Sequence, residues 1–422
     1  MEAFIGIEQM GQNAKTASRK LRMLETVQKN KLLGVMAETL EKHKSAILAA
    51  NQMDLDAASK MGLKEALLER LELNEKKFVD MVIGLRQVME LKDPVGEIDS
   101  MHINQDGLEI GSKRVPLGVI GIIYESRPNV TIDAAALCLK TGNAVILKGG
   151  SDALLTNQAI MASVKEALSD QNLPEGCVQL VESTDRSLVK DLLEATNYVD
   201  CIIPRGGAGL IKFVVDNAKV PIIETGAGNC HIYVDDDYEI GGALDIITNA
   251  KVQRPGACNA VETVLVHRGI AETFVPQLVK HMTEQKVSLF LCQNALELLD
   301  EIPASVLLAT EEDWRTEYLD FKLAVRIVYS LDEALDHIDE YSTGHSEAIL
   351  THNYENARKF LSAVDSSAVY VNASTRFTDG SQFGFGAEIG ISTQKLHARG
   401  PMGLRALTSS KYVIYGNGQI RK

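Results

Sequence analysis

The segment that decides the fold is LGVIGII at residues 117–123, an apolar run of the length of one buried strand. A helical stretch at 133–140 follows it, and a second apolar run lies at 144–147. Further apolar runs come at 178–181, 199–203 and 221–223, with another helical stretch at 154–168. Because strands alternate with helices, the sequence predicts a parallel sheet with right-handed crossovers.

The same alternation begins again at residue 230. Apolar runs lie at 230–234, 263–266, 323–329 and 368–371, and helical stretches lie at 243–250 and 270–285. Two such blocks predict two doubly wound α/β domains.

Residues 4–92, ahead of the first block, carry apolar side chains at helical spacing, and we expect helices there. The clearest of these positions are Leu32, Leu33, Met36, Leu40, Phe78, Met81, Val82 and Leu85. Residues 51–56 supply turn and cap chemistry, so we expect a break between helices at that point.

Residues 102–112 alternate polar and apolar side chains around Gln105-Asp106-Gly107, which predicts a β-hairpin. Residues 411–415 near the end of the chain read as another strand. Exposed edge strands need a covering partner, so we expect the hairpin and this strand to form an oligomerisation arm.

The composition excludes several classes of function. Of the 422 residues 45% are hydrophobic and 24% charged, which is typical of a folded globular protein. The net charge of −14 disfavours binding to nucleic acid or to an anionic membrane. No apolar run is long enough to span a bilayer and no leader is evident, so we expect a cytoplasmic protein.

Six cysteines are scattered along the chain without a C-x-x-C pair, which predicts neither a disulfide framework nor a metal site. Five of them lie within apolar runs, as buried structural cysteines do. Cys258 instead lies in Arg254-Pro255-Gly256-Ala257-Cys258-Asn259, a turn of small residues that leaves space for a reactant. The spacing alone leaves both a nucleophilic and a structural cysteine open.

Neither G-x-G-x-x-G nor a P-loop fingerprint occurs, although the alternation suggests a nucleotide-binding sheet. Three segments, at 115–120, 127–129 and 139–148, are similar to those of the aldehyde dehydrogenase superfamily, which binds its dinucleotide without that fingerprint. The spacing from Glu224 to Cys258 resembles the superfamily's as well.

Within that superfamily, the chain most resembles the γ-glutamyl phosphate reductase family. The matching segments are 124–131, 254–259, 342–349, 372–377, 386–393 and 397–401. The resemblance implies an enzyme, an NADP-dependent oxidoreductase that converts L-glutamyl 5-phosphate to L-glutamate 5-semialdehyde with release of phosphate. This reaction is the second step of proline biosynthesis from glutamate.

The resemblance also implies roles for three catalytic residues. Cys258 would attack the acyl carbon to give a thioester, and Asn129 would stabilise the oxyanion together with the Cys258 N–H. Glu224 falls where hydrolytic relatives keep a general base; because phosphate is the leaving group here, it would either tune Cys258 or relay a proton.

For the cofactor, the resemblance implies that Lys148 contacts the adenosine ribose. Ser151 stands where NAD-specific relatives carry a glutamate, which favours NADPH, although the neighbouring Asp152 would oppose this if its carboxylate pointed inward. The turn Arg205-Gly206-Gly207 corresponds to the family's glycine turn, and Glu317 matches the glutamate on the nicotinamide ribose.

Six residues in the matching segments could bind the acyl phosphate and the α-carboxylate, and which binds which stays open. They are Arg127, His345, Ser346, Arg376, His397 and Arg399. The expected partners are this small-molecule substrate, further copies of the chain in a homodimer or homotetramer, and glutamate 5-kinase, the enzyme that makes the labile substrate.

The resemblance implies an aldehyde-dehydrogenase-like fold of two doubly wound α/β domains and the β-arm. We expect a discontinuous cofactor-binding domain at 1–97, 114–225 and 378–404, a catalytic domain at 226–377, and an arm at 98–113 and 405–422. Two kinds of alternative stay open: a CoA-linked or hydrolytic aldehyde dehydrogenase, and a catalytically silent relative.

Overall fold

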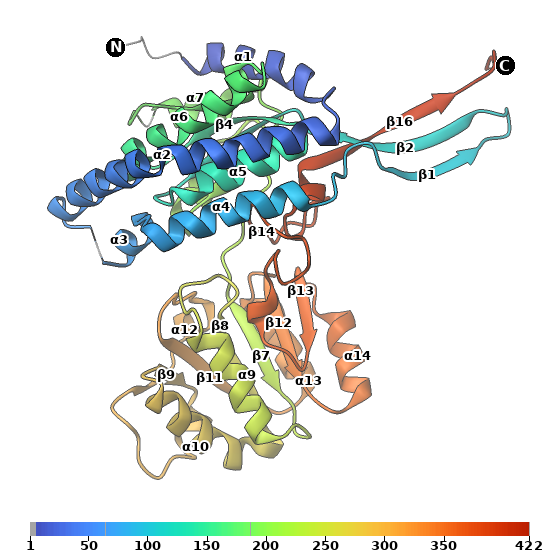
Figure 1. The fold of residues 1–422 in the computed structure, drawn as a ribbon. Helices are drawn as coiled ribbons and strands as arrows, with labels where there is room; N and C mark the ends of the chain where they lie inside the picture. The colour runs from blue at the N-terminus through green and yellow to red at the C-terminus, as the bar shows by residue number, and fades with distance from the viewer. Residues whose placement is uncertain (1–5, 64, 186, 422) are drawn as a thin grey trace. The chain divides into compact units, whose positions relative to one another are not determined.

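The computed structural model describes residues 6–63, 65–185 and 187–421. The chain divides into two compact units, each described here by itself, and Figure 1 shows the path of the chain through them. Unit 1 comprises Met1–Thr225, Gly384–Gly390 and Met402–Lys422, and unit 2 comprises Gly226–Phe383 and Ile391–Pro401.

The segment 378–404, which we expected in one domain, is divided between the units. Unit 2 keeps 378–383 and 391–401. The reason is local pairing: β14 (Ile391–Ser392) forms an antiparallel pair with β15 (Gly400–Pro401), and the Ile391 carbonyl accepts a hydrogen bond from the Gly226 N–H at 3.1 Å.

Unit 1 contains a four-stranded parallel sheet in the order β5-β4-β3-β6. The strands are β3 (Val119–Tyr124), β4 (Ala144–Lys148), β5 (Val178–Leu180) and β6 (Cys201–Arg205). Every residue of β3 is buried, as the decisive apolar run predicts. The expected strand at 221–223 is wrong, because this segment contributes only an isolated bridge between Ile222 and Ile202.

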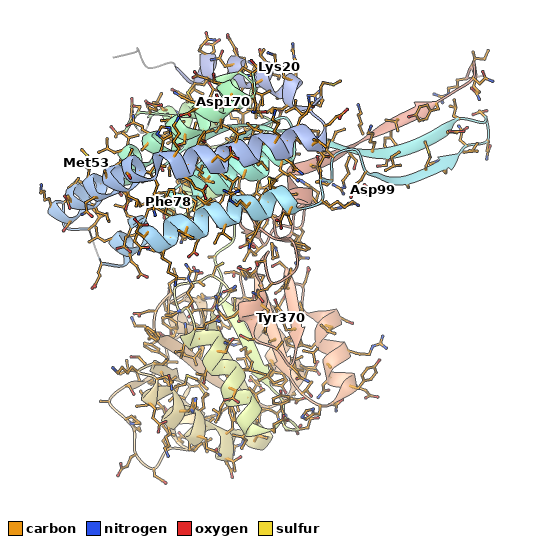
Figure 2. The ribbon with its side chains drawn as sticks, viewed as in Figure 1. Lys20, Met53, Phe78, Asp99, Asp170 and Tyr370 are labelled. Carbon is orange, nitrogen blue, oxygen red and sulfur yellow. The ribbon has the colours of Figure 1, made fainter. Side chains whose placement is uncertain are left out.

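Helices surround this sheet, and their buried positions are those that the helical spacing predicts. Phe78 on α4 is buried, whereas Met53 on α2 is exposed (Figure 2). The helices of unit 1 are α1 (Ile7–Leu21), α2 (Thr26–Lys60), α3 (Glu65–Leu71), α4 (Glu75–Glu90), α5 (Asn129–Lys140), α6 (Leu154–Asp170), α7 (Ser187–Glu194) and α8 (Ala208–Asn217). Short 3₁₀ helices lie at Ser151–Ala153, Glu175–Cys177 and Leu404–Leu407.

The expected break at 51–56 is wrong, since α2 runs through it. The polar residues there bond to other elements. Asp54 accepts hydrogen bonds from the N–H and Oγ1 of Thr156 in the first turn of α6, at 2.8 and 2.6 Å. Asn51 bonds to the backbone of Leu71 and Leu73. These side chains do form capping hydrogen bonds, but they form them with elements that are distant in sequence.

Three antiparallel strands form the predicted arm sheet, in the order β1-β2-β16. They are β1 (Ile98–Ile103), β2 (Glu109–Pro116) and β16 (Thr408–Tyr415). In the hairpin turn the Asn104 side chain accepts from the N–H groups of Asp106 and Leu108, and Gly107 has φ +81°. Figure 1 shows the sheet extending away from the helices of unit 1, and β1 is exposed along its whole length.

Unit 2 contains a seven-stranded parallel sheet in the order β10-β9-β11-β8-β7-β12-β13. Its strands are β7 (Cys230–Val234), β8 (Val261–His267), β9 (Ser288–Leu291), β10 (Val306–Leu308), β11 (Lys322–Val328), β12 (Ser346–Leu350) and β13 (Ala368–Val371). The sequence did not predict β9, β10 and β12. Two of these are very short, and β12 begins with the polar residues Ser346 and Glu347.

The helices of unit 2 are α9 (Ile240–Val252), α10 (Arg268–Glu284), α11 (Gln293–Leu296), α12 (Glu311–Arg315), α13 (Leu331–Tyr341) and α14 (Tyr354–Ala363), with a 3₁₀ turn at Thr375–Phe377. Side chains from α9, α10 and the central strands form one apolar core. Two parallel-sheet units and an arm sheet confirm the predicted fold class. None of the described helices has the length and hydropathy to cross a membrane.

Candidate active site

Unit 1 gathers its candidate residues at the carboxyl ends of three neighbouring strands. Lys148 ends β4, Arg205 ends β6, and the loop that follows β3 carries Arg127 and leads to Asn129. Because β4, β3 and β6 are adjacent and parallel, these residues share one edge of the sheet. Open α/β sheets bind their ligands at this edge.

Lys148 is 7% exposed, and burial lowers the pKa of its ammonium group. Its Nζ donates to the Gly149 carbonyl at 3.0 Å. Ser151 is exposed, and its Oγ donates to Asp152 Oδ1 at 3.4 Å, while Ser126 Oγ donates to Asp152 Oδ2 at 3.0 Å. The Asp152 carboxylate therefore lies beside Ser151.

The turn Arg205-Gly206-Gly207 leads directly into α8. The Gly207 N–H donates to Glu125 Oε2 at 3.0 Å, so a carboxylate lies at the amino end of this helix. A Cβ on Gly206 would contact the Glu125 side chain, which explains why glycine stands there.

Asn129 opens α5 with an exposed side chain. Its Nδ2 donates to Asp133 Oδ2 at 2.9 Å, one turn further along the helix. Burial raises the pKa of Asp133 to about 6, while the hydrogen bond from Asn129 and the charge of Arg205 oppose that rise. Asp133 thus fixes which way the Asn129 amide points.

Glu224 lies near the end of the first segment of unit 1 and is half-buried. The next residue, Thr225, donates from Oγ1 to the Pro204 carbonyl at 3.0 Å. This bond ties the Glu224 segment to the end of β6.

In unit 2, Cys258 lies in the loop between α9 and β8 and is half-buried. Cys138, Cys177, Cys201 and Cys230 are fully buried. Burial raises the pKa of Cys177 and Cys201 to about 12, and raises the pKa of Cys138 and Cys230 as well. These four thiols stay protonated, whereas Cys258 has the partial exposure that a nucleophile requires.

The backbone of Cys258 is held by the segment that enters β7. The Cys230 thiol donates to the Cys258 carbonyl at 3.2 Å. Gly228 packs so closely that a Cβ on it would overlap the same carbonyl. The Gly228 N–H in turn donates to Glu317 Oε1 at 2.7 Å.

Arg376 reaches the Cys258 loop from the 3₁₀ turn after β13. Its Nε donates to Gln253 Oε1 at 3.0 Å, and its Nη1 donates to Asn259 Oδ1. Burial lowers the pKa of Arg376 and the charge of Arg254 lowers it further, whereas Cys258 acts in the opposite direction. Two arginines therefore act electrostatically next to the cysteine loop.

The segment 342–347 enters unit 2 from its surface: Thr343 is exposed, whereas His345, Ser346 and Glu347 are buried. His345 and Ser346 have no exposed surface, and burial lowers the pKa of His345 to about 4. His345 Nδ1 lies 2.8 Å from Ser346 Oγ and 3.8 Å from Cys230 Sγ. His345 thus lies against Cys230, while Ser346 Oγ lies between His345 and Thr378 Oγ1, and a role of either residue in substrate binding stays a prediction.

Thr343 holds the same segment from the other side. Its Oγ1 donates to the Ala227 carbonyl at 2.6 Å and accepts from the Asn229 N–H at 3.0 Å. The structure does not place Arg399 in this cluster, since its Nη2 binds Asp365. His397 is exposed.

Several residues of these arrangements were missed by reasoning from the sequence: Glu125, Asp133, Cys230, Arg254 and Thr343. Glu125, Arg254 and Thr343 lie within segments that carry the family resemblance, which is the signal that could have found them, whereas Cys230 lies in none of these segments. Asp133 could have been found from its spacing of one helical turn after Asn129.

Comparison with known proteins identifies the family of the chain. The model of the aldehyde dehydrogenase family matches residues 6–291. The γ-glutamyl phosphate reductase of Caldanaerobacter subterraneus subsp. tengcongensis is 58% identical over 416 residues, which cover 99% of this chain and 100% of that protein. The chain belongs to the γ-glutamyl phosphate reductase family.

Solved structures separate this family from its relatives. The crystal structure of γ-glutamyl phosphate reductase from Thermotoga maritima matches with a TM-score of 0.95 at 50% identity, over 98% of this chain and 99% of that one. An acetylating aldehyde dehydrogenase from Geobacillus thermoglucosidasius matches with a TM-score of 0.70 at 18% identity, over 98% of this chain and 97% of that one. The second likeness is one of fold alone.

Proposed function

We propose that this chain reduces L-glutamyl 5-phosphate to L-glutamate 5-semialdehyde with NADPH, through a thioester on Cys258. Membership of the γ-glutamyl phosphate reductase family makes it an oxidoreductase of proline biosynthesis that acts on an acyl phosphate. The observation that carries the mechanism is the half-buried Cys258 in a loop to which Arg376 is hydrogen-bonded.

The first step is acyl transfer to sulfur. The Cys258 thiolate attacks the acyl carbon, a C–S bond forms, and the C–O bond to phosphate breaks. Arg376 and Arg254 are proposed to stabilise the negative charge of the departing phosphate. Arg127, His345, Ser346 and His397 are the remaining candidates for the substrate's anionic groups, while Arg399 is already paired with Asp365.

Oxyanion stabilisation is proposed for Asn129 and the Cys258 N–H. Asp133 accepts from Asn129 Nδ2 and so keeps the amide nitrogen, rather than its oxygen, turned in a fixed direction. For Glu224 we retain two roles, tuning of Cys258 or relay of the proton that its thiol loses.

A nicotinamide cofactor follows from the aldehyde dehydrogenase family, and the choice of NADPH is our proposal. When bound, it supplies the hydride that reduces the thioester. Unit 1 offers polar groups and glycine backbone at the carboxyl edge of its sheet, which fits a dinucleotide. The residues proposed to hold it are Lys148, Ser151, Arg205, Gly206 and Gly207, with Glu317 from unit 2.

We further propose a cytoplasmic homodimer or homotetramer joined through the arm. Glutamate 5-kinase, which makes the labile substrate, is the protein partner we expect. Unit 1 would be the cofactor-binding part and unit 2 the part that carries the nucleophile.

The decisive experiment is the reverse reaction, oxidation of L-glutamate 5-semialdehyde by NADP⁺. Turnover should require inorganic phosphate. Arsenate should be able to replace phosphate, whereas CoA should not be able to replace it. Equal rates with and without phosphate, with free glutamate as the product, would show a hydrolytic aldehyde dehydrogenase instead. A requirement for CoA would show a CoA-linked enzyme.

A further inference from the structure

A buried ion pair closes the base of the loop that carries Cys258. Lys251 lies in the last turn of α9 and Glu262 is the second residue of β8, so they flank the loop on either side. Lys251 Nζ lies 2.6 Å from Glu262 Oε2, and both side chains are fully buried. Burial lowers the pKa of Lys251 and raises the pKa of Glu262 to about 7, while each partner's charge opposes the other's shift.

The second oxygen of Glu262 reaches another loop. Oε1 accepts a hydrogen bond from the Leu319 N–H at 3.3 Å, and Leu319 has the unusual φ of +53°. Two residues earlier, Glu317 accepts from the Gly228 N–H, and Gly228 packs against the Cys258 carbonyl. The ion pair at the base of the Cys258 loop is thus connected, through the segment from Glu317 to Leu319 and through Gly228, to the backbone of Cys258 itself.

Stability alone does not explain why a lysine and a glutamate occupy these positions. Removing two charges from water is costly, and a buried ion pair is often no more stabilising than apolar residues of similar size. What an ion pair adds is a fixed geometry, because its partners and hydrogen bonds satisfy each other in one arrangement. Here that arrangement fixes both ends of the loop and the neighbouring Glu317 segment.

We propose that Lys251 and Glu262 are positioning residues that hold the Cys258 loop and the Glu317 segment in their reactive arrangement. This inference rests on the proposed function, in which Cys258 is the nucleophile. In this proposal the ion pair does not contact substrate or cofactor. Loss of the pair must therefore change the reactivity of Cys258.

The test uses two double variants of the full-length protein. Lys251→Met/Glu262→Leu replaces the pair by apolar side chains and removes the acceptor for the Leu319 N–H. Lys251→Gln/Glu262→Gln removes the charges but keeps hydrogen-bonding groups at both positions. The rate of Cys258 alkylation by iodoacetamide, followed by peptide mass spectrometry across a pH series, reports loop geometry and thiolate formation without turnover.

Unit 1 provides a matched control. Lys29 and Asp93 form an equally enclosed pair, 2% and 4% exposed, at 2.8 Å, and the second oxygen of Asp93 also accepts from a backbone N–H, that of Val95. Lys29→Met/Asp93→Leu therefore makes the same chemical change in the unit that does not carry Cys258. Melting temperatures of all variants measure the loss of stability that the two pairs have in common.

We expect the apolar pair at 251 and 262 to slow Cys258 alkylation and kcat by about tenfold, and the amide pair to stay within about twofold of the native protein. The control should melt earlier without slowing alkylation. Native rates in the apolar variant, or equal slowing in the control, would overturn the inference. If the apolar variant does not fold, Lys251→Met/Glu262→Gln takes its place with at least about threefold slowing expected.

Failure of the inference and failure of the proposed function are distinguishable. If Cys258→Ala retains turnover, the nucleophile has been assigned wrongly and the proposed function fails. If Cys258→Ala is inactive but the apolar pair reacts at native rates, only the positioning role of Lys251 and Glu262 is wrong.

Discussion

In unit 1, Lys148 and Arg205 stand at the carboxyl ends of β4 and β6, whereas in unit 2 three of the loops around the nucleophile stand at the amino ends of their strands. Gly228 precedes β7, Cys258 precedes β8, and Glu317 precedes β11. Both sheets are parallel. The two units therefore differ in whether the loops before the strands or the loops after them hold the candidate functional residues.

The two edges are also built differently. At the unit 1 edge Ser151, Asn129 and Gly207 are exposed, and each is hydrogen-bonded to one nearby carboxylate. At the unit 2 edge the loops are tied to one another by buried groups, among them Glu262 and Cys230. A long cofactor needs accessible surface, and a nucleophile needs a fixed position. Substitutions at Ser151 and the neighbouring Asp152 of unit 1 should therefore change cofactor binding, and those in the tied loops of unit 2 should change reactivity, stability or phosphate binding.

The largest expected effect is the loss of the nucleophile. Cys258→Ala should lower kcat by a factor on the order of 10⁴ without changing the melting temperature appreciably, because it removes the group that forms the covalent intermediate. Steady-state kinetics of NADP⁺ reduction measure the loss. Cys292, the other half-buried cysteine, is the control, and its alanine variant should stay active. Substantial turnover by Cys258→Ala would remove the covalent mechanism.

Acid should destabilise unit 2 through the buried histidines His345 and His337, whose pKa values the fold lowers. Protonation of Glu262, whose pKa is raised to about 7, opposes the loss. The fold lowers the pKa of His345 from 6.5 to about 4, so the stability that this group contributes is complete above pH 6.5 and is lost as the pH falls toward 4, when the unfolded chain binds the proton first. The loss from this group should reach about 2 kcal/mol by pH 5. Urea unfolding at pH 7.5 and pH 5 measures it.

The single tryptophan allows unit 2 to be observed by itself. Trp314 lies in α12 and is 7% exposed, so its fluorescence reports the unfolding of this unit. His345→Gln should be less stable than the native protein at pH 7.5 but should lose less on acidification. The same loss between the two pH values in both proteins would contradict the assignment of acid sensitivity to His345.

Much of the fold could be predicted because burial and periodicity are local signals. The runs around Val119 and Ala144 are apolar throughout, so the strands were evident. The break expected near Asn51 was wrong for a physical reason: turn-forming side chains also serve as caps for other elements, and a sequence does not show that Asp54 will meet Thr156. The order of the strands in the sheet is equally invisible before folding.

The candidate site could be predicted only where chemistry depends on residue type. Cys258 stands out because small residues surround it. His345 was expected among the substrate ligands because it lies in a segment that matches the family, and only the packing of β12 shows that it is enclosed and that burial lowers its pKa. Thr343 and Cys230 act through backbone contacts, which carry no signal in residue type.

Arg376 tests whether the arginines beside the cysteine loop bind phosphate. Arg376→Gln keeps a hydrogen-bonding group but removes the charge, so the KM for phosphate in the reverse reaction should rise about tenfold, with a smaller change for the aldehyde. Arg358, an exposed arginine on α14, provides the matched control. Equal increases of both KM values would show a general distortion of the loop instead of a phosphate site.

The smallest expected effect lies at the exposed edge of unit 1, where Ser151 and Asp152 adjoin. With Ser151 in the place of the glutamate of NAD-specific relatives, NADPH should be preferred, and Ser151→Glu should lower kcat/KM for NADPH roughly fivefold through repulsion of the 2′-phosphate across solvent. The kcat/KM for NADH should change little in Ser151→Glu.

Asp152 already places a carboxylate beside Ser151, and Ser126 orients that carboxylate by a hydrogen bond. Asp152→Asn should therefore raise kcat/KM for NADPH. Because both side chains lie at the surface or near it, neither change should alter the melting temperature appreciably. A native preference for NADH would contradict the choice of cofactor. An unchanged NADPH preference in both variants would show instead that the 2′-phosphate does not bind near Ser151 and Asp152 at the carboxyl end of β4.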